Sequence, residues 1–146
     1  MKIHQLSVFL ENKPGRLGEP CQALADAGVT ILTLSLAETN QFGILRLIVP
    51  DSEKGKAVLE QAGCVVNVTE VVATSVANRP GGLADILQVI EDAGINVEYM
   101  YAFSVRRQDR AVLVFRFDDP DAAIALLQAK GFHVVEPVQL LDQATE

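Results

Sequence analysis

The chain has 146 residues, of which 49% are hydrophobic and 21% charged, so it can bury a core and is not a disordered tail. Twelve basic residues against nineteen acidic ones give a net charge of −7. This balance argues against a nucleic-acid partner and against an anionic membrane surface, because both need concentrated positive charge.

The cysteines and histidines do not form a metal-binding pattern. Cys21 and Cys64 lie far apart, as do His4 and His133, and no Cys-x-x-Cys pair occurs. We therefore expect no metal and no other cofactor, and we expect both cysteines to be buried, reduced thiols. No cationic leader opens the chain and no apolar run approaches about 18 residues, which predicts a cytoplasmic protein without a membrane-spanning segment.

No motif for catalysis is present. The chain has neither a glycine-rich nucleotide loop nor a Gly-x-Ser-x-Gly nucleophile motif. The acidic run at 118–121 stands where a helix is expected to begin, so capping explains it better than a metal does. Arg106, Arg107 and Arg110 are expected to form a solvated basic turn, with an anionic partner as the less favoured alternative. The sequence thus predicts that the protein is not an enzyme.

The strongest signal is an internal repeat. Asn-Lys-Pro-Gly-Arg-Leu at 12–17 reappears as Asn-Arg-Pro-Gly-Gly-Leu at 78–83, and Asp-Ala-Gly-Val at 26–29 returns as Asp-Ala-Gly-Ile at 92–95. A repeat of about 67 residues is one small domain rather than a solenoid unit. We expect two domains, residues 1–68 and 69–146.

The first copy is expected to hold a strand, a helix, two strands, a helix and a last strand. Pro20 is tolerable only in the first turn, so the first helix should begin close to Leu17, and Gly28 should end it. Ser52 is expected to cap the second helix, which should run to about Ala62. The strands are expected at 3–10, 30–36, 43–49 and 64–68.

The second copy repeats this order with clearer signals for where its helices begin and end. One stripe of its first helix carries Leu83, Ile86, Leu87, Ile90 and Ala93. Asp119-Pro120 should cap its second helix, Gly131 should end it, and residues 105–110 should form a longer turn. The order β-α-β-β-α-β, given twice, predicts an α+β chain of two ferredoxin-like repeats, with antiparallel sheets and helices on one face. Almost no linker separates the two copies.

The other face of each sheet is expected to be open and unusually apolar. If Leu32, Leu34 and Leu36 face the helices in copy one, the matching alternation in copy two places a set of residues on the sheet face away from the helices. That set comprises Val97, Tyr99, Tyr101, Phe103, Val112, Val114 and Arg116. Such a face favours burial by another subunit. The alternative is a bulge that shifts the register and sends the tyrosines into the core.

The repeated loop has chemistry that suits a small zwitterion. Its glycines let a ligand approach the backbone, and the first helical N–H groups, near 16–17 and 82–83, favour a carboxylate. The asparagine offers both a donor and an acceptor. Alternatively, Pro-Gly before a helix is ordinary turn chemistry, and duplication copies fold signals as well as sites.

The two motifs, each followed by Ala-Gly-Val or Ala-Gly-Ile, resemble the signature of ACT domains, and the similarity spans residues 3–141. The run from 94 to 103 also resembles tandem ACT proteins that lack a catalytic domain. The resemblance implies a regulatory module that binds an amino acid or a related ligand at an interface between two modules. The loop after the first strand would contact the ligand together with the second strand of a neighbour.

The resemblance also implies which residues contact the ligand. The loop asparagine of serine-binding members matches Asn12 and Asn78, whereas their second-strand asparagine matches Asn96 but is Thr30 in copy one. Their histidine, two residues before the loop asparagine, is absent here, so the two sites are expected to be unequal. The expected ligand-binding residues are Asn12, Pro14, Gly15, Arg16, Leu17, Thr30, Asn78, Pro80, Gly81, Gly82, Leu83 and Asn96.

The resemblance leaves two functions open. The first is a homodimeric sensor protein that binds an amino acid at interfaces between ACT domains. The second is a regulatory subunit of a separate metabolic enzyme, such as acetolactate synthase. Copy one resembles the ACT part of such subunits, but copy two stands where they usually carry a different C-terminal region.

Overall fold

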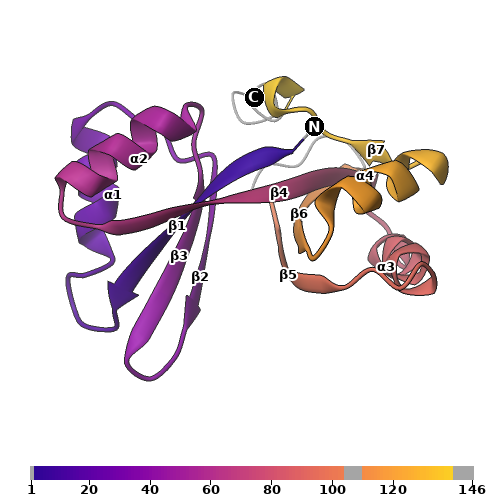
Figure 1. Cartoon of the computed structure of the whole chain (residues 1–146), viewed down its shortest axis with the longest axis horizontal. Coiled ribbons are helices and arrows are strands. Elements are labelled where there is room, and N and C mark those ends of the chain that lie inside the picture. Colours follow the sequence, from indigo (N-terminus) through magenta and orange to yellow (C-terminus); the bar gives the residue numbers. More distant parts are fainter. Residues whose placement is uncertain (1, 104–109, 140–146) are drawn as a thin grey trace. The chain divides into compact units, whose positions relative to one another are not determined.

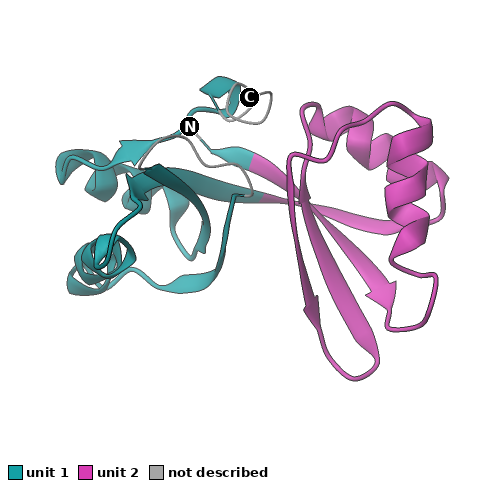
Figure 2. Ribbon diagram, turned by 180° about the vertical axis from the view of Figure 1, so that it is seen from behind, with its two compact units in different colours: residues 1–3, 70–146 teal, residues 4–69 magenta. Residues whose placement is uncertain are grey.

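The computed structural model describes residues 2–103 and 110–139, so most of the longer turn expected at 105–110 lies outside the described residues. Contacts between Cα atoms divide the chain into two compact units (Figure 2). The first-repeat unit is His4–Thr69, and the second-repeat unit is Met1–Ile3 with Glu70–Glu146. Each unit contains one copy of the repeated loop and its helix.

The first-repeat unit is an antiparallel sheet with two helices on one face, and Figure 1 shows α1 and α2 packed beside each other there. Its strand order is β2-β3-β1-β4. The elements are β1 (Ile3–Glu11), α1 (Gly18–Asp26), β2 (Thr33–Glu38), β3 (Phe42–Ile48), α2 (Ser52–Gln61) and the first part of β4 (Val65–Ala77).

Alternate residues of β1 and β3 build the core of this unit with one residue from each helix. Leu6, Val8, Leu45 and Leu47 are fully buried against Leu24 of α1 and Leu59 of α2. The period of two in the strands and the single stripe on each helix therefore meet on one face, as the sequence pattern predicts.

The last strand of the first repeat and the first strand of the second are one strand. The sequence predicts two strands separated by a very short link, but β4 runs without a break for 13 residues. The stretch contains no glycine or proline, and it is rich in valine and threonine, so nothing in it interrupts an extended backbone. Its residues up to Thr69 belong to the first-repeat unit and the rest to the second.

The second-repeat unit has the same strand order, β5-β6-β4, with β7 paired on the other side of β4. Its helices contact each other, and Phe115 and Phe117 stack in its core with ring centroids 5.2 Å apart. Both units are thus ferredoxin-like, as predicted. The elements are α3 (Gly82–Asp92), β5 (Val97–Ala102), β6 (Arg110–Phe117), α4 (Pro120–Ala129) and β7 (His133–Val134).

A β-bulge in β5 is present, but it does not send the tyrosines into the core. The register shifts between Val97 and Tyr99, so that Val97 pairs with Phe117 and packs on the helix-facing core. Beyond the bulge, Tyr99 pairs with Arg116 and Tyr101 with Val114, on the opposite face. The prediction was right for the tyrosines and wrong for Val97, because the extra residue reverses the alternation there.

The expectation of an exposed apolar face is wrong for part of the second-repeat unit. Phe103, Val112 and Val114 lie on the face away from the helices, yet they are only 4%, 4% and 0% exposed. These three positions are therefore buried, not exposed as the alternation predicts. Tyr99 and Tyr101 remain half-buried.

Strand β2 carries two leucines that are exposed although they lie on the helix-facing side. Leu34 pairs with Leu47 and Leu36 with Leu45, which places both on the helix-facing side, as predicted. They are nevertheless 49% and 48% exposed, because β2 is the outermost strand of its sheet.

Helices α2 and α4 each have an aspartate cap. Asp119 accepts a hydrogen bond from the backbone N–H of Ala122 at 3.1 Å, and Pro120 is the first residue of α4, as predicted. In α2 the cap is Asp51, which accepts from the N–H of Lys54 at 3.1 Å. Ser52 was expected in that role, but it already lies in the helix, whereas Asp51 has the extended backbone of a capping residue.

None of the helices within the described residues has the length and apolarity needed to cross a bilayer.

Replacing Asp119 with alanine is expected to lower the free energy of unfolding by about 1 kcal/mol, because the Ala122 N–H loses its acceptor. Urea unfolding followed by circular dichroism measures this change. Asp119→Asn keeps a side-chain oxygen at the same place and should lose much less. Equal losses in both variants would show that the carboxylate does not act as a helix cap.

Candidate functional site

The two repeated loops lead into the two helices that have no side-chain cap. Neither α1 nor α3 receives a capping hydrogen bond from a side chain. Within the described part of the chain, no acceptor faces the backbone N–H groups of Leu17 and Gly18, or those of Leu83 and Ala84. Both loops therefore end in a pair of backbone donors that are free to bind an anion.

The backbone of the two loops is the same at one glycine. Gly15 has φ +88° and Gly81 has φ +87°, a left-handed conformation that side-chain-bearing residues rarely adopt. This shared turn explains why the Pro-Gly pair occurs in both copies of the motif.

The loops differ at the next position, which is Arg16 in the first repeat and Gly82 in the second. Helix α3 begins at Gly82, but α1 begins only at Gly18. Pro20 explains the later start: it has no N–H to donate, so it fits only the first turn of α1. A Cβ atom at Gly82 would clash with the carbonyl oxygen of Ala77, so only glycine fits there.

The loop asparagine of the first repeat is held by the neighbouring hairpin. The N–H of Asn12 donates to the carbonyl of Gln41 at 2.9 Å, and its side-chain amide donates to the Glu38 carboxylate at 3.3 Å and to the carbonyl of Thr39 at 3.4 Å. Asn12 also lines a small cavity of about 120 Å³ together with Leu17. The donor side of this amide is therefore already in use.

The loop asparagine of the second repeat is free. The exposed side chain of Asn78 makes no hydrogen bond with any residue that the structure describes. Its neighbour Arg79 contacts the Asp85 carboxylate at 3.1 Å and donates to the carbonyl of Pro80 at 3.0 Å.

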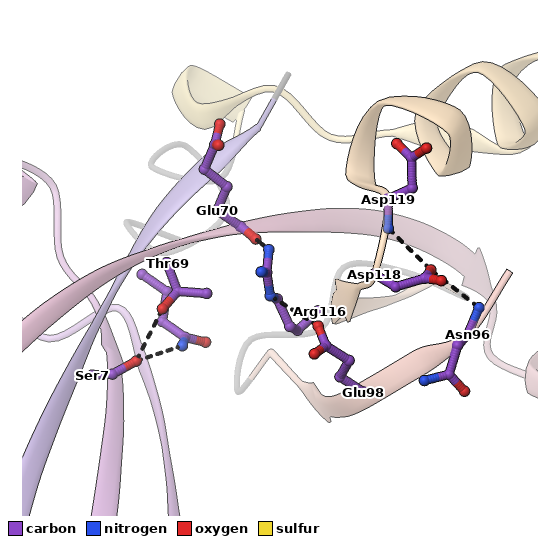
Figure 3. Close-up of polar contacts among 9 residues, drawn as sticks. Ser7, Thr69, Glu70, Asn96, Glu98, Arg116, Asp118 and Asp119 are labelled. Atoms are coloured by element: carbon purple, nitrogen blue, oxygen red, sulfur yellow. Dashed lines mark hydrogen bonds and ion pairs between the residues drawn. The ribbon is translucent and has the colours of Figure 1, made fainter.

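The second-strand asparagine is fixed through its backbone. The N–H of Asn96 donates to the Asp118 carboxylate at 3.2 Å, and that carboxylate also accepts the N–H of Asp119 at 3.0 Å (Figure 3). The side-chain amide of Asn96 points away from Asp118 in this view and is exposed. Sequence reasoning assigned Asp118 to helix capping only and did not find this contact.

A second polar contact in this unit was not predicted from the sequence either. Arg116 donates to the carbonyl of Glu70 at 2.9 Å and pairs with the Glu98 carboxylate at 3.2 Å (Figure 3). Glu98 lies within the bulged part of β5, so the register that places it could not be inferred from the alternation of residues.

Within one unit, the loop asparagine and the second-strand residue lie at opposite ends of the sheet. In the second repeat, Ala77 pairs with Arg110 and Val97 with Phe117, which are the two ends of β6. This strand has eight residues, and at about 3.3 Å per residue its ends are roughly 23 Å apart. Asn78 and Asn96 of one unit therefore cannot touch the same small ligand.

The first repeat has the same separation. Glu11, just before Asn12, pairs with Phe42, whereas Thr33, three residues after Thr30, pairs with Ile48. The structure thus brings Asn12, Pro14, Gly15, Arg16 and Leu17 together in one loop but leaves Thr30 at the far end of β3. It also groups Asn78, Pro80, Gly81, Gly82 and Leu83 in the second loop and leaves Asn96 apart.

No group of three or more histidine, cysteine, aspartate or glutamate side chains within the described residues could hold a metal ion. Cys21 and Cys64 are free thiols, and both are half-buried against the core rather than fully buried as expected. Burial raises the pKa of the Cys64 thiol, and the negative charge of Glu19 raises it further.

Replacing Gly82 with alanine is expected to lower the free energy of unfolding by about 1–3 kcal/mol, because the new Cβ atom meets the backbone of Ala77. Thermal and urea unfolding measure the loss. Gly18→Ala is the matched control, since Gly18 opens α1 and a Cβ atom there meets nothing within 4 Å. A Gly82→Ala protein as stable as the Gly18→Ala protein would contradict the steric argument.

The chain is similar to several solved structures. A protein from Bacteroides thetaiotaomicron is 38% identical to this chain, with a TM-score of 0.90 and 96% of each chain covered. The regulatory subunit of aspartate kinase from Thermus thermophilus has a TM-score of 0.63 at 16% identity, and 88% of this chain and 92% of that chain are covered.

The corresponding subunit from Thermus flavus has a TM-score of 0.62 at 16% identity, covering 100% of this chain and 95% of that one. At this identity, the two kinase subunits show a shared fold. A comparison with curated proteins found no match. The family described as "ACT domain pair" matches residues 1–143, and with nearly the whole length covered, the chain belongs to this ACT domain pair family.

Proposed function

We propose that this protein is a regulatory sensor that binds an amino acid, or a closely related small ligand, at an interface between ACT domains. The observation that carries the proposal is the pair of uncapped helices. Helices α2 and α4 are capped by aspartates, whereas α1 and α3, which follow the repeated loops, present N–H groups without an acceptor among the described residues. A ligand carboxylate supplies the acceptor that a cap would otherwise supply.

The separation of the two asparagines supports an interface site. A small ligand held by a loop of one module can reach a second-strand residue only if a different module provides that residue. The neighbour is either the other repeat or a second copy of the chain. Binding would then favour one arrangement of modules over another, with a coupling of about 1–3 kcal/mol, which is how a binding protein becomes a regulator.

The loop of the second repeat is the better candidate for the stronger site. Its Asn78 side chain is available, whereas the amide of Asn12 is occupied by Glu38 and Thr39. The second repeat also supplies Asn96, which offers a donor and an acceptor, where the first repeat has only the hydroxyl of Thr30. We therefore propose that Asn78 and Asn96 make the principal side-chain contacts, with backbone contacts from Gly81 to Leu83.

The proposed chemistry is binding rather than catalysis. The loops supply backbone amides and one neutral side chain, which hold a carboxylate or an ammonium group in place. An amino acid of about ten non-hydrogen atoms reaches micromolar affinity without exceeding the ceiling of about 1.5 kcal/mol per atom for small ligands.

Calorimetric titration of the full chain with each of the twenty amino acids tests the proposal. At least one is expected to bind, and Asn78→Ala and Asn96→Ala should each weaken its affinity by about tenfold or more, because each removes a hydrogen bond to a charged group. Asn67→Ala, at an exposed asparagine of β4 outside both loops, is the matched control and should bind as the unmodified protein does.

Two outcomes would refute the proposal. One is a failure of all twenty amino acids to bind. The other is undiminished affinity in both the Asn78→Ala and the Asn96→Ala proteins.

A further inference from the structure

The second-repeat unit contains a cavity that shares Gly82 with the proposed interface site but includes neither Asn78 nor Asn96. It has a volume of about 310 Å³, which is the size of a small-molecule site. We call it the arginine cavity; the residues that line it include Arg79, Gly82, Asp85, Arg110, Gly131 and Phe132.

Three segments that are far apart in the sequence meet at this cavity because of the strand pairing. Ala77, at the end of β4, pairs with Arg110 at the start of β6, and Ser75 pairs with His133 at the start of β7. The end of β4, the start of β6 and the turn between α4 and β7 therefore lie at one end of the sheet. Asn96 of the same unit lies at the other end of the sheet.

Arg110 is positioned by a buried neighbour. Its Nε donates to the hydroxyl of Ser75 at 2.9 Å, and its Nη2 donates to the carbonyl of Ser75 at 2.8 Å. Ser75 is only 7% exposed, so it offers a firm anchor to an arginine that is itself exposed. The sequence predicts a solvated basic turn at this residue, but Arg110 is instead the first residue of β6.

The positive charge of Arg110 is not neutralised by the described residues. No described carboxylate pairs with it, whereas Arg79 is paired with Asp85 at 3.1 Å. Two arginines against one aspartate leave the cavity with a net positive charge, in a chain whose net charge is −7. The uncapped start of α3, at Gly82, adds the positive end of a helix dipole to the same wall.

The first repeat lacks these features. By the pairing of its strands, Phe42 occupies the position of Arg110, since Phe42 pairs with Glu11 as Arg110 pairs with Ala77. By the repeated motif, Arg16 replaces Gly82 and pairs with Glu19 at 2.9 Å. Lys13 stands at the position of Arg79, so duplication accounts for a basic residue there but not for Arg110.

We propose that the arginine cavity binds the anionic group of a small acid, a carboxylate or a phosphate. A guanidinium group whose orientation is fixed presents its remaining N–H donors in the fork geometry that oxyanions match. Nη1 of Arg110 supplies these donors, since it makes no hydrogen bond with the described residues. Arg79, already held by Asp85, also lines the cavity and adds electrostatic attraction.

Calorimetric titration of the full chain with inorganic phosphate and with succinate, at constant ionic strength, tests this proposal. Saturable binding of at least one probe is expected. Binding of phosphate alone identifies a phosphate ester as the ligand class, binding of succinate alone identifies a carboxylic acid, and binding of both supports the shared oxyanion chemistry.

Substitutions of the two arginines test whether the probe binds in the arginine cavity. Arg110→Gln should weaken probe binding by about tenfold or more, and Arg79→Gln should weaken it by a smaller factor. Lys54→Gln, which removes one positive charge from exposed α2 in the first-repeat unit, should leave the affinity unchanged. Thermal unfolding of each variant confirms that it is folded, and Arg79→Gln remains informative if Arg110→Gln is not.

The result that overturns the proposal is the absence of saturable binding by either probe, or affinities in the folded arginine variants equal to that of the unmodified protein. Asn78→Ala and Asn96→Ala should still bind the probe normally. The arginine variants test the cavity and the asparagine variants test the proposed amino-acid site, so the failure of one proposal can be told from the failure of the other.

Discussion

Backbone pairing along β3 and β6 keeps each repeated loop at one end of its sheet and the start of the second strand at the other. The ladder of β6 separates Asn78 from Asn96 by roughly 23 Å, and no side-chain movement closes such a distance. A ligand of amino-acid size therefore meets either the loop or the second strand of a given unit. This constraint supports the proposal of a ligand site between modules.

The same pairing concentrates polar chemistry at the loop end of the second-repeat unit. The strand register sets Arg110 beside Ser75, and the turn before β7 comes to the same place. The two repeats share a backbone but differ in side chains at the matched positions, with Arg16 and Phe42 in one and Gly82 and Arg110 in the other. The loop ends of the two repeats therefore share a fold but differ in their chemistry.

Helix starts divide into two kinds, and the division follows from the sequence. Asp51 and Asp119 precede α2 and α4 and satisfy N–H groups there. The loops before α1 and α3 carry Pro-Gly instead, so their backbone turns sharply but offers no side-chain acceptor. Capping stabilises the helices that complete the fold, whereas the uncapped starts keep backbone donors available.

Several features could be read from the amino-acid order because they depend on local rules. The repeat, the β-α-β-β-α-β order, the aspartate cap at 119 and the late start of α1 follow from motif identity, apolar spacing and the missing N–H of Pro20. The asparagines of the candidate site were proposed from the repeated motif and from the resemblance to the ACT family, and they remain a prediction.

Tertiary structure decided what depends on register and on contacts between distant segments. Local patterns did not predict four features of the structure. These are the bulge that moves Val97 into the core, the unbroken strand β4, the hydrogen bonds of Arg110 to Ser75 and the hydrogen bond of Asn96 to Asp118. A single extra residue reverses the facing of a strand, and nothing in its alternation reveals that residue. The amino-acid order therefore determined which elements form, and the pairing of the strands decided which side chains meet.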